Sequence, residues 1–484
     1  MANLYPGPLG RARRGSAVGR GVTTLSAALL VASSLTACAR NSAVGQPQAP
    51  GPGGRPGAPG AAAGTTAAGE MQRLFRSMGL IAGAGTIPFV GSISFLTAPT
   101  PDTTLVLLAV SLPSRALTFT REGDRYAAEY TVRVEARRGP TVAAVVEAKE
   151  SVRVPTFRET ARTDESVIWQ QYLRLPPGRY SLAIAIKDET GIRNAAEEVA
   201  VEVPRIAGGA VGTPIAVYEA IPRGAVDSLP RLLARPRSMV TFGVDSQLPV
   251  YLEAAGPNAP ATVDVRVLGD GDVELWRDAV PLTSRVSVRS TTIGIPVTRL
   301  GVGISTIVVS AAGRSDTARA RVLVSLGDDL PIASLEEMVT YLRWFTTPDR
   351  LKPMRDAAPA QRSEAWAKFL KDTDPVPGTP ENEGLRDYFA RIRQANVRFR
   401  DDGPIGWQTD RGTAFVGLGE PDNIYDSGLS DPNARVRQQV WEYRQMRVQL
   451  VFLDQTGFGR WRLSTSGRAE LEGAIRRKLI QQQQ

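Results

Sequence analysis

The sequence predicts a multidomain protein, with two all-β sandwich-like domains followed by an α+β C-terminal domain. The chain has 484 residues, which is enough for several domains of ordinary size. Its middle consists of short runs in which apolar and polar residues alternate between turn residues, a pattern typical of antiparallel β-sandwiches. From about residue 327 onward, apolar residues recur at helical spacing before alternating runs return.

Residues 1–37 have the pattern of a secretory signal peptide. They contain no acidic residue, and an apolar stretch from Val22 to Ala37 follows an arginine-rich start. The stretch ends in Leu35-Thr36-Ala37-Cys38, where Cys38 is the one cysteine of the chain. This segment resembles the lipobox of bacterial lipoproteins. The resemblance implies cleavage before Cys38 and attachment of lipid to its thiol, although a chance cysteine or an uncleaved helix would leave the same pattern.

The expected location follows from the lipid anchor. Several acyl chains on one cysteine hold a protein stably at a bilayer. Ala39 stands where the lipoprotein resemblance would place an aspartate as an inner-membrane retention signal, so the outer membrane is expected, facing the periplasm or the surface. Residues 38–69 are rich in Gly, Pro and Ala and are predicted to be a disordered tether.

Two β-sandwich-like domains are predicted over residues 70–205 and 206–326. The clearest strands of the first cover residues 126–134 and 180–186, where alternate residues are apolar. The clearest strands of the second cover 262–267, 305–309 and 319–324. Exported modules of this kind commonly act as spacers or bind partners, and nothing in these runs indicates catalysis.

The C-terminal domain is predicted over residues 327–484. Ser334 and Glu337 have the spacing of a capping box at the start of a helix, and a second helix carries Trp366. A third helix is expected with Thr379 as N-cap and Pro380 as its first residue. Strands are then predicted over residues 413–418, 439–444, 448–453 and 460–463. A last helix is expected from Gly467, capped by Ser466.

Several motifs of this domain are shared with one protein family. They are Gly406-Trp407-Gln408-Thr409-Asp410, Asp410-Arg411-Gly412, Gly419-Glu420-Pro421-Asp422, Trp441-Glu442-Tyr443-Arg444 and the segment 375–383. At these residues, over about 330–480, the chain resembles the GWxTD domain family. The resemblance implies an exported bacterial protein but supplies no established activity. Leu370 and Thr373 depart from the family pattern, which would have tryptophan and arginine at these positions.

The candidate binding or motif residues are Gly406, Trp407, Thr409, Asp410, Arg411, Gly419, Glu420, Pro421, Asp422, Trp441 and Tyr443. A structural role is favoured for them: Thr409 and Asp410 suit capping, and Arg411 suits pairing with Asp410 or another carboxylate. Trp407 is large enough to anchor its loop into the helices. The alternatives are a binding groove, or a pair of carboxylates for glycoside hydrolysis, which must lie roughly 5–10 Å apart.

Composition excludes several kinds of chemistry. The chain has no histidine and one cysteine, which rules out a Ser-His-Asp triad, a Cys-His pair and an intramolecular disulfide. No catalytic residue, metal site or cofactor is predicted. From residue 327 onward basic and acidic residues are equal in number, 23 each, so nucleic-acid binding is not expected.

The sequence therefore indicates an exported protein that is lipid-anchored through Cys38. Its C-terminal domain is interpreted as a binding or assembly module with a protein partner in the cell envelope. The competing hypothesis is a hydrolase that acts on an envelope polymer with carboxylates near Asp410 and Glu420.

Overall fold

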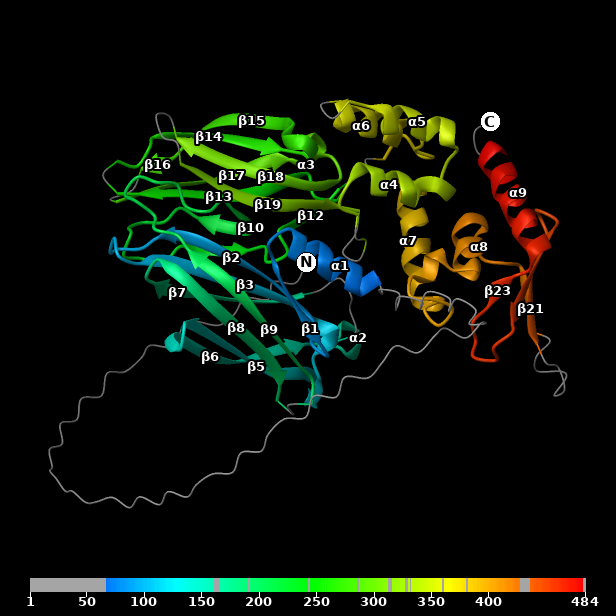
Figure 1. Cartoon of the computed structure of the whole chain (residues 1–484), viewed down its shortest axis with the longest axis horizontal. Coiled ribbons are helices and arrows are strands. Elements are labelled where there is room, and N and C mark those ends of the chain that lie inside the picture. The colour runs from blue at the N-terminus through cyan, green and yellow to red at the C-terminus, as the bar shows by residue number, and fades with distance from the viewer. Residues whose placement is uncertain are drawn as a thin grey trace, which may run out of the picture. The chain divides into compact units, whose positions relative to one another are not determined.

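The computed structural model describes residues 67–160, 166–189, 192–242, 244–256, 258–284, 287–311, 316–326, 330, 332–358, 361–379, 382–426 and 436–481. The predicted signal peptide, Cys38 and all but the end of the predicted tether lie outside these residues. The last residues of that tether, 67–69, belong to helix α1 (Ala67–Ser77) (Figure 1).

The first β region is one nine-stranded antiparallel sheet. Its strands are β1 (Ile81–Gly85), β2 (Phe89–Thr97), β3 (Thr104–Pro113), β4 (Thr120–Glu122), β5 (Arg125–Arg138), β6 (Thr141–Val154), β7 (Ser166–Leu175), β8 (Gly178–Asp188) and β9 (Asn194–Val203). They follow the order β4-β5-β8-β9-β1-β2-β3-β7, and β6 pairs with β5. Short helical segments, η1 (Ser114–Ala116) and α2 (Phe157–Thr160), interrupt the connections.

Strand β1 joins the two halves of this sheet. Its residues Ile81, Ala82 and Gly83 pair with β2, whereas Ala84 and Gly85 pair with β9. One face of the curled sheet is apolar because residues two apart in a strand point the same way. On β5, for example, Ala128, Tyr130, Val132 and Val134 are all buried in the core. The strands predicted over 126–134 and 180–186 are confirmed as parts of β5 and β8.

The second β region has two five-stranded sheets. One has the order β11 (Arg231–Ala234), β10 (Ile215–Ile221), β13 (Gln247–Ala255), β17 (Val288–Pro296) and β16 (Thr283–Ser284). The other has the order β12 (Met239–Thr241), β19 (Thr317–Ser325), β18 (Gly303–Ala311), β14 (Thr262–Leu268) and β15 (Glu274–Pro281). Two short helical segments, η2 (Asp270–Asp272) and α3 (Val297–Leu300), lie in the connections. Both sheets contribute to one core, and all pairs except the parallel pair β12–β19 are antiparallel.

A buried ion pair lies in the second β region next to the first. Arg223 Nη1 donates to Glu253 Oε1 at 2.6 Å, and the side chains are 1% and 0% exposed. The same Nη1 donates to the carbonyl oxygen of Thr97 on β2, and the Tyr251 hydroxyl donates to the second oxygen of Glu253. Apolar residues of β2, β3, β10, β11 and β13 form a shared cluster around this contact. These contacts connect the two β regions.

Helices and a small sheet form the C-terminal region. The helical elements are α4 (Leu335–Tyr341), η3 (Leu342–Trp344), α5 (Pro348–Asp356), α6 (Arg362–Asp372), α7 (Glu383–Arg398), η5 (Gly406–Gln408), α8 (Asp410–Leu418) and α9 (Thr465–Gln481). The antiparallel sheet has the order β20 (Asn423–Asp426), β21 (Arg437–Tyr443), β22 (Val448–Asp454) and β23 (Arg462–Leu463). One apolar core joins these helices and strands. The predicted order along the chain, in which β-rich regions are followed by a region that contains helices, is confirmed.

Three local predictions in this region are wrong. Residues 413–418 form the end of helix α8 and not a strand, because Thr409 caps a helix that buries most of the segment from Gly412 onward. Asn382, and not Thr379, caps α7: its Oδ1 accepts from Leu385 N, so α7 begins at Glu383, beyond Pro380. Ser464, and not Ser466, accepts from Gly467 N at the start of α9.

The capping box at Ser334 is confirmed in its main contact. Ser334 Oγ accepts from Glu337 N at 3.2 Å, and Glu337 Oε2 accepts in turn from Ala333 N.

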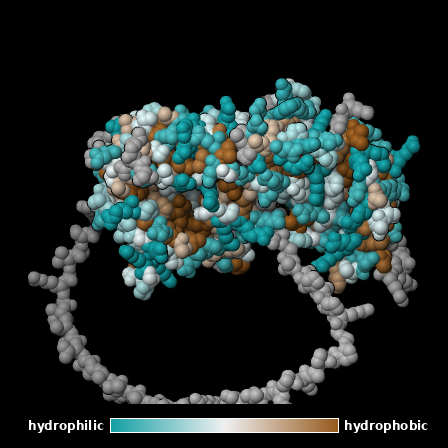
Figure 2. Space-filling view, turned by 45° about the horizontal axis from the view of Figure 1, so that its top comes forward, coloured by the Kyte–Doolittle hydropathy of each residue, from teal (hydrophilic) through white to brown (hydrophobic). Residues whose placement is uncertain are grey.

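The face shown in Figure 2 is largely hydrophilic and is interrupted by patches of hydrophobic residues. Within the part of the chain that is described, no helix has both the length and the apolar character needed to cross a membrane.

Candidate functional site

The motif Gly406-Trp407-Gln408-Thr409-Asp410 forms the turn that leads into α8. Its first three residues are the short helix η5, and Thr409 is the N-cap of α8. Thr409 Oγ1 accepts from Gly412 N at 3.0 Å and donates to Gly406 O at 2.7 Å. A threonine hydroxyl therefore satisfies an amide that a helix start leaves unpaired, as the sequence predicted.

The two glycines of this turn permit close backbone contacts. A Cβ atom on Gly406 would lie 2.2 Å from the carbonyl oxygen of Ala395, and one on Gly412 would lie 1.9 Å from the carbonyl oxygen of Gly406. Glycine is needed here because the backbones of η5, α7 and α8 approach too closely for any side chain. Close packing, and not a left-handed backbone conformation, is therefore the reason for glycine at these two positions.

Trp407 is buried, with no exposed side-chain surface. Its ring centroid lies 4.9 Å from that of Tyr341 at the end of α4. Its backbone N–H donates to Asn396 Oδ1 on α7 at 3.1 Å. Trp407 thus anchors the turn to two helices, in agreement with the structural interpretation, and does not form the floor of an open groove.

Asp410 links α8 to the last strand and helix. Its Oδ2 accepts from Leu463 N at 2.8 Å, and its carboxylate pairs with Arg468 of α9 at 3.3 Å. Arg411, the next residue, pairs with another carboxylate. It donates from Nε and Nη2 to the two oxygens of Asp402, at 2.7 and 2.6 Å. Of the two partners considered for Arg411, the structure therefore selects Asp402, whose side chain is fully buried.

The second motif, Gly419-Glu420-Pro421-Asp422, follows the end of α8. Gly419 has φ +99°, a conformation that favours glycine, and its carbonyl oxygen accepts from the Tyr443 hydroxyl at 3.1 Å. Glu420 pairs with Arg398 at 2.7 Å on the surface. Asp422 Oδ2 accepts from Arg444 N at 2.7 Å, and Pro421 is buried.

Trp441 and Tyr443 lie on strand β21 and are 1% and 2% exposed. Trp441 packs against Phe399 and Phe452, with ring centroids 5.8 and 4.9 Å away. Its Nε1 donates to Gln439 Oε1 at 2.8 Å. The structure thus brings the motif residues into one region where α7, α8, α9 and the sheet meet. Most of their polar atoms are used to join these elements.

Leu370 and Thr373, the two residues that depart from the family pattern, lie beside the start of α7. Asn382 Nδ2 donates to the carbonyl oxygen of Leu370 at 2.8 Å and to Thr373 Oγ1 at 3.1 Å. In this chain, the two residues therefore help to hold the N-cap of the helix that carries Asn396.

One feature near the motif was missed by the sequence analysis. The guanidinium carbon of Arg343 lies 4.9 Å from the ring centroid of Trp407 and 5.2 Å from that of Trp344. Arg343 is exposed, and among the described residues it has no hydrogen-bond or ion-pair partner. An arginine stacked on tryptophan and free of a carboxylate is available to an anionic group. The signal in the sequence was the Arg343-Trp344 pair at the end of a predicted helix.

Two further cations lie on the helices that follow. Arg391 of α7 has its guanidinium carbon 5.9 Å from the Tyr388 ring centroid, and its Nε has no hydrogen-bond partner among the described residues. Lys478 of α9 donates to the carbonyl oxygens of Gly417 and Leu418, at 2.8 and 3.2 Å. Burial, assisted by the charge of Arg391, lowers the pKa of Lys478 to about 8. Lys478 thus caps the end of α8, whose last carbonyls attract a positive charge.

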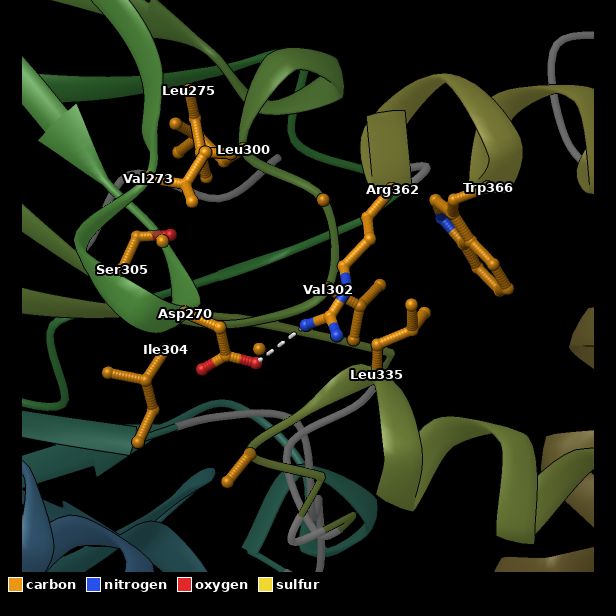
Figure 3. Close-up of a pocket in the computed structure, with 14 residues that line it drawn as sticks. Asp270, Val273, Leu275, Leu300, Val302, Ile304, Ser305, Leu335, Arg362 and Trp366 are labelled. Carbon is orange, nitrogen blue, oxygen red and sulfur yellow. Dashed lines mark hydrogen bonds and ion pairs between the residues drawn. The ribbon is translucent and has the colours of Figure 1, made fainter. Parts of the chain in front are cut away.

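A small cavity lies between the second β region and the helices (Figure 3). Its volume is about 50 Å³, and Arg362 at its side donates to Asp270 at 3.3 Å and to Glu336 at 2.9 Å. The labelled side chains around it are mostly apolar, among them Leu300, Val302 and Trp366. A space of this size holds a few water molecules and not a substrate. Across the described ranges, no group of three or more acidic or cysteine side chains is arranged to hold a metal ion.

Comparison with known proteins identifies the C-terminal region. Residues 310–456 match the family model described as the GWxTD domain, so the chain contains a GWxTD domain. The resemblance predicted from the motifs is therefore confirmed, with a match that begins inside β18. The description names a sequence motif and no activity. No curated protein matches the chain.

Proposed function

We propose that this protein is exported and lipid-anchored through Cys38, and that its GWxTD domain is a binding or assembly module of the cell envelope. In this proposal residues 1–37 are the signal peptide, and the acylated Cys38 holds the chain at a bacterial membrane, with Ala39 favouring the outer membrane. The two β regions act as sandwich-like spacers between the membrane and the GWxTD domain.

The observation that carries the binding role is the position of Arg343. Its guanidinium group lies over the ring of Trp407, the buried tryptophan of the motif, at 4.9 Å. Since Trp407 is fixed by Tyr341 and Asn396, it offers a rigid support for an exposed cation. The motif then has two effects in this account: it joins the helices and the sheet, and it supports Arg343 where a partner can reach it.

An acidic surface on an envelope protein is the partner that suits this arginine. Guanidinium groups bind carboxylates in a two-point geometry, and weak hydration makes arginine favourable at interfaces. Arg391, which also lacks an ion-pair partner among the described residues, adds positive charge near Tyr388, a residue that the charge of Arg343 also reaches.

The competing hydrolase hypothesis is disfavoured by the placement of its carboxylates. Asp410 begins α8 and Glu420 lies beyond its end, so a helix of nine residues, about 13 Å long, lies between their backbones. Their partners also lie on different elements, since Asp410 bonds Leu463 and Arg468 whereas Glu420 bonds Arg398. A catalytic pair for glycoside hydrolysis needs carboxylates roughly 5–10 Å apart.

A photocrosslinking experiment in the native envelope tests the binding role. A photoreactive amino acid replaces the exposed Thr340, one turn before Arg343, in otherwise wild-type and Arg343→Gln chains. We expect one envelope protein to be captured by the first chain, and capture to fall about tenfold or more with Arg343→Gln, because a charged hydrogen bond is lost. Arg355→Gln, at an exposed arginine paired with its neighbour Asp356, is the matched control.

Two results would contradict the proposal. One is a capture yield that is the same with and without Arg343. The other is that no crosslinked complex decreases when the chain without the photoreactive amino acid is added in excess as a competitor. A captured protein whose contact surface is basic would also count against the role given to Arg343.

A further inference from the structure

A second cavity, of about 490 Å³, lies in the β-rich part of the chain. It is lined by residues that directly follow α1 and by parts of β2, β10, β18 and β19. Its volume is within the range of small-molecule sites. It lies outside the GWxTD motif region.

Unpartnered hydroxyl groups line one wall of this cavity. Ser92 and Ser94 on β2 are 9% and 6% exposed, and both line the cavity. Because they are two residues apart on one strand, they point to the same face. Neither hydroxyl has a hydrogen-bond partner among the described residues. Both hydroxyl oxygens remain accessible, so they can bond a molecule inside the cavity.

Another part of the lining is positively charged. Arg319 and Arg321 project from one face of β19, and Thr306 on β18 lies directly opposite Arg321. Arg321 donates to the carbonyl oxygen of Ser77, whereas Arg319 has no hydrogen-bond or ion-pair partner among the described residues. Arg235 adds a third guanidinium group, although it is held by Val217 O, Met239 O and Asp245.

Unusual backbone conformations gather at the same place. In the described ranges three residues other than glycine have φ in the left-handed region, namely Ser238 at 46°, Asp272 at 57° and Arg447 at 52°. Two of them, Ser238 and Asp272, line this cavity. Such conformations cost free energy and cluster at ligand sites, where they place side chains for binding. Asp272 is also the one carboxylate among the lining residues.

We propose that this cavity binds a small acidic sugar, a saccharide that carries a carboxylate or a phosphate group. Arg319 would pair with the anionic group, since guanidinium groups match carboxylate and phosphate oxygens in a two-point geometry. The hydroxyls of Ser92, Ser94 and Thr306 would bond the hydroxyls of the sugar, and Asp272 would accept from one of them. Because Arg235 is paired with Asp245, Arg319 and Arg321 are counted against Asp272, and they still give the cavity an excess of positive charge, which favours acidic over neutral sugars.

Calorimetric titration of the full chain tests this site with four probes: glucuronate, glucose 6-phosphate, glucose and inorganic phosphate. We expect the two acidic sugars to bind, and glucose and phosphate to bind at least about tenfold more weakly, because each makes only part of the contacts. Arg319→Gln should weaken the acidic sugars about tenfold or more, and Ser94→Ala should weaken them severalfold. Arg179→Gln, at an exposed arginine that does not line the cavity, should have no effect.

Two binding results would contradict this assignment. Equal affinity for phosphate and glucose 6-phosphate would mean that an anion alone is recognised, and would overturn the saccharide assignment. The absence of binding by both acidic sugars at millimolar concentration would overturn the site. Thermal unfolding of each variant checks that the fold is kept, and Arg319→Gln, at an exposed position, is expected to leave the melting temperature unchanged. This test does not depend on the function proposed for the GWxTD domain.

Discussion

Arg411 holds the buried carboxylate of Asp402 in a two-point ion pair, with nitrogen–oxygen distances of 2.6 and 2.7 Å. The Asp402 side chain is 0% exposed and that of Arg411 is 15% exposed. The guanidinium carbon of Arg411 also lies 5.3 Å from the ring centroids of both Phe399 and Trp461. One arginine of the motif region therefore connects α8 to the loop after α7 and to the residues before β23.

Replacing Arg411 by alanine is predicted to lower the free energy of unfolding by about 3–5 kcal/mol, because it leaves Asp402 buried without its partner. Urea titration of the purified chain measures the change. The matched control is Arg398→Ala, which breaks the surface pair with Glu420, whose side chains are 41% and 58% exposed. An exposed pair contributes at most about 1 kcal/mol. Equal effects of the two substitutions would contradict the role given to the buried pair.

Alanine at either motif glycine is predicted to destabilise the chain by at least about 2 kcal/mol. At Gly412 the added Cβ would lie 1.9 Å from a backbone oxygen, and at Gly406 it would lie 2.2 Å from another, so helices must separate. Gly378→Ala is the control, because a Cβ there meets no atom within 4 Å. We expect this control to change the unfolding free energy by no more than about 0.5 kcal/mol. Thermal and urea unfolding provide the comparison, and a tolerated Gly412→Ala would show that the backbones are not so close.

Trp407→Ala is predicted to cost about 3–5 kcal/mol, because it removes a fully buried indole from between α4 and α7. Phe458→Ala is the aromatic control, since that side chain is 85% exposed, and it should change stability by no more than about 0.5 kcal/mol. Chemical denaturation followed by far-UV circular dichroism distinguishes the two. If Trp407→Ala were as mild as the control, Trp407 would not be the anchor of the turn.

The free energy of unfolding is predicted to rise between pH 8 and about pH 10 through the titration of Lys478. Burial lowers the pKa of this lysine to about 8 in the folded chain, whereas an unfolded lysine titrates near about 10.4. Between these values the unfolded state binds more protons, so raising the pH favours the folded state. Below pH 8 the ammonium is charged in both states and the full cost of burying it remains.

The measurement for this prediction is the difference in unfolding free energy between wild type and Lys478→Met at several pH values. Between pH 8 and about pH 10, we expect the unfolding free energy of wild type to rise relative to that of Lys478→Met by up to about 1.4 kcal/mol per pH unit. The series stops below pH 10, because burial raises the pKa of Tyr388 and of other tyrosines, whose titration acts in the opposite direction. Lys352→Met, at an exposed lysine, should not reproduce the difference. A pH-independent difference for Lys478→Met would contradict the prediction.

The strands were predictable where one face of a sheet is buried and the other is solvated. This gives strict alternation in β14 and in β5 from Ala128 onward, and the predicted segments fall inside the observed strands. Helix α8 was missed because Thr413-Ala414-Phe415-Val416-Gly417-Leu418 contains the β-branched and aromatic residues of a strand. The cap at Thr409 and burial on nearly all sides impose a helix there, and these are tertiary effects that propensity does not contain.

The structural role of the motif was predictable in part. The capping ability of Thr409 and the size of Trp407 are properties of single residues, and both have the expected effect. The stacking of Arg343 on Trp407 was not predictable, because it brings together residues far apart in the sequence. The pairing of Arg411 with Asp402 joins residues only nine apart, but several carboxylates lie near Arg411 in the sequence, and the sequence alone could not select among them.

Mass spectrometry of the mature N-terminus, on protein purified from its own membrane, tests the central claim most directly. The account places the binding surface of the GWxTD domain in the cell envelope through a lipid on Cys38. It predicts that residues 1–37 are absent and that the first residue is Cys38 carrying the mass of its acyl chains, and that Cys38→Ala releases the protein from the membrane. An intact first segment beginning at Met1, with an unmodified thiol at Cys38, would contradict it.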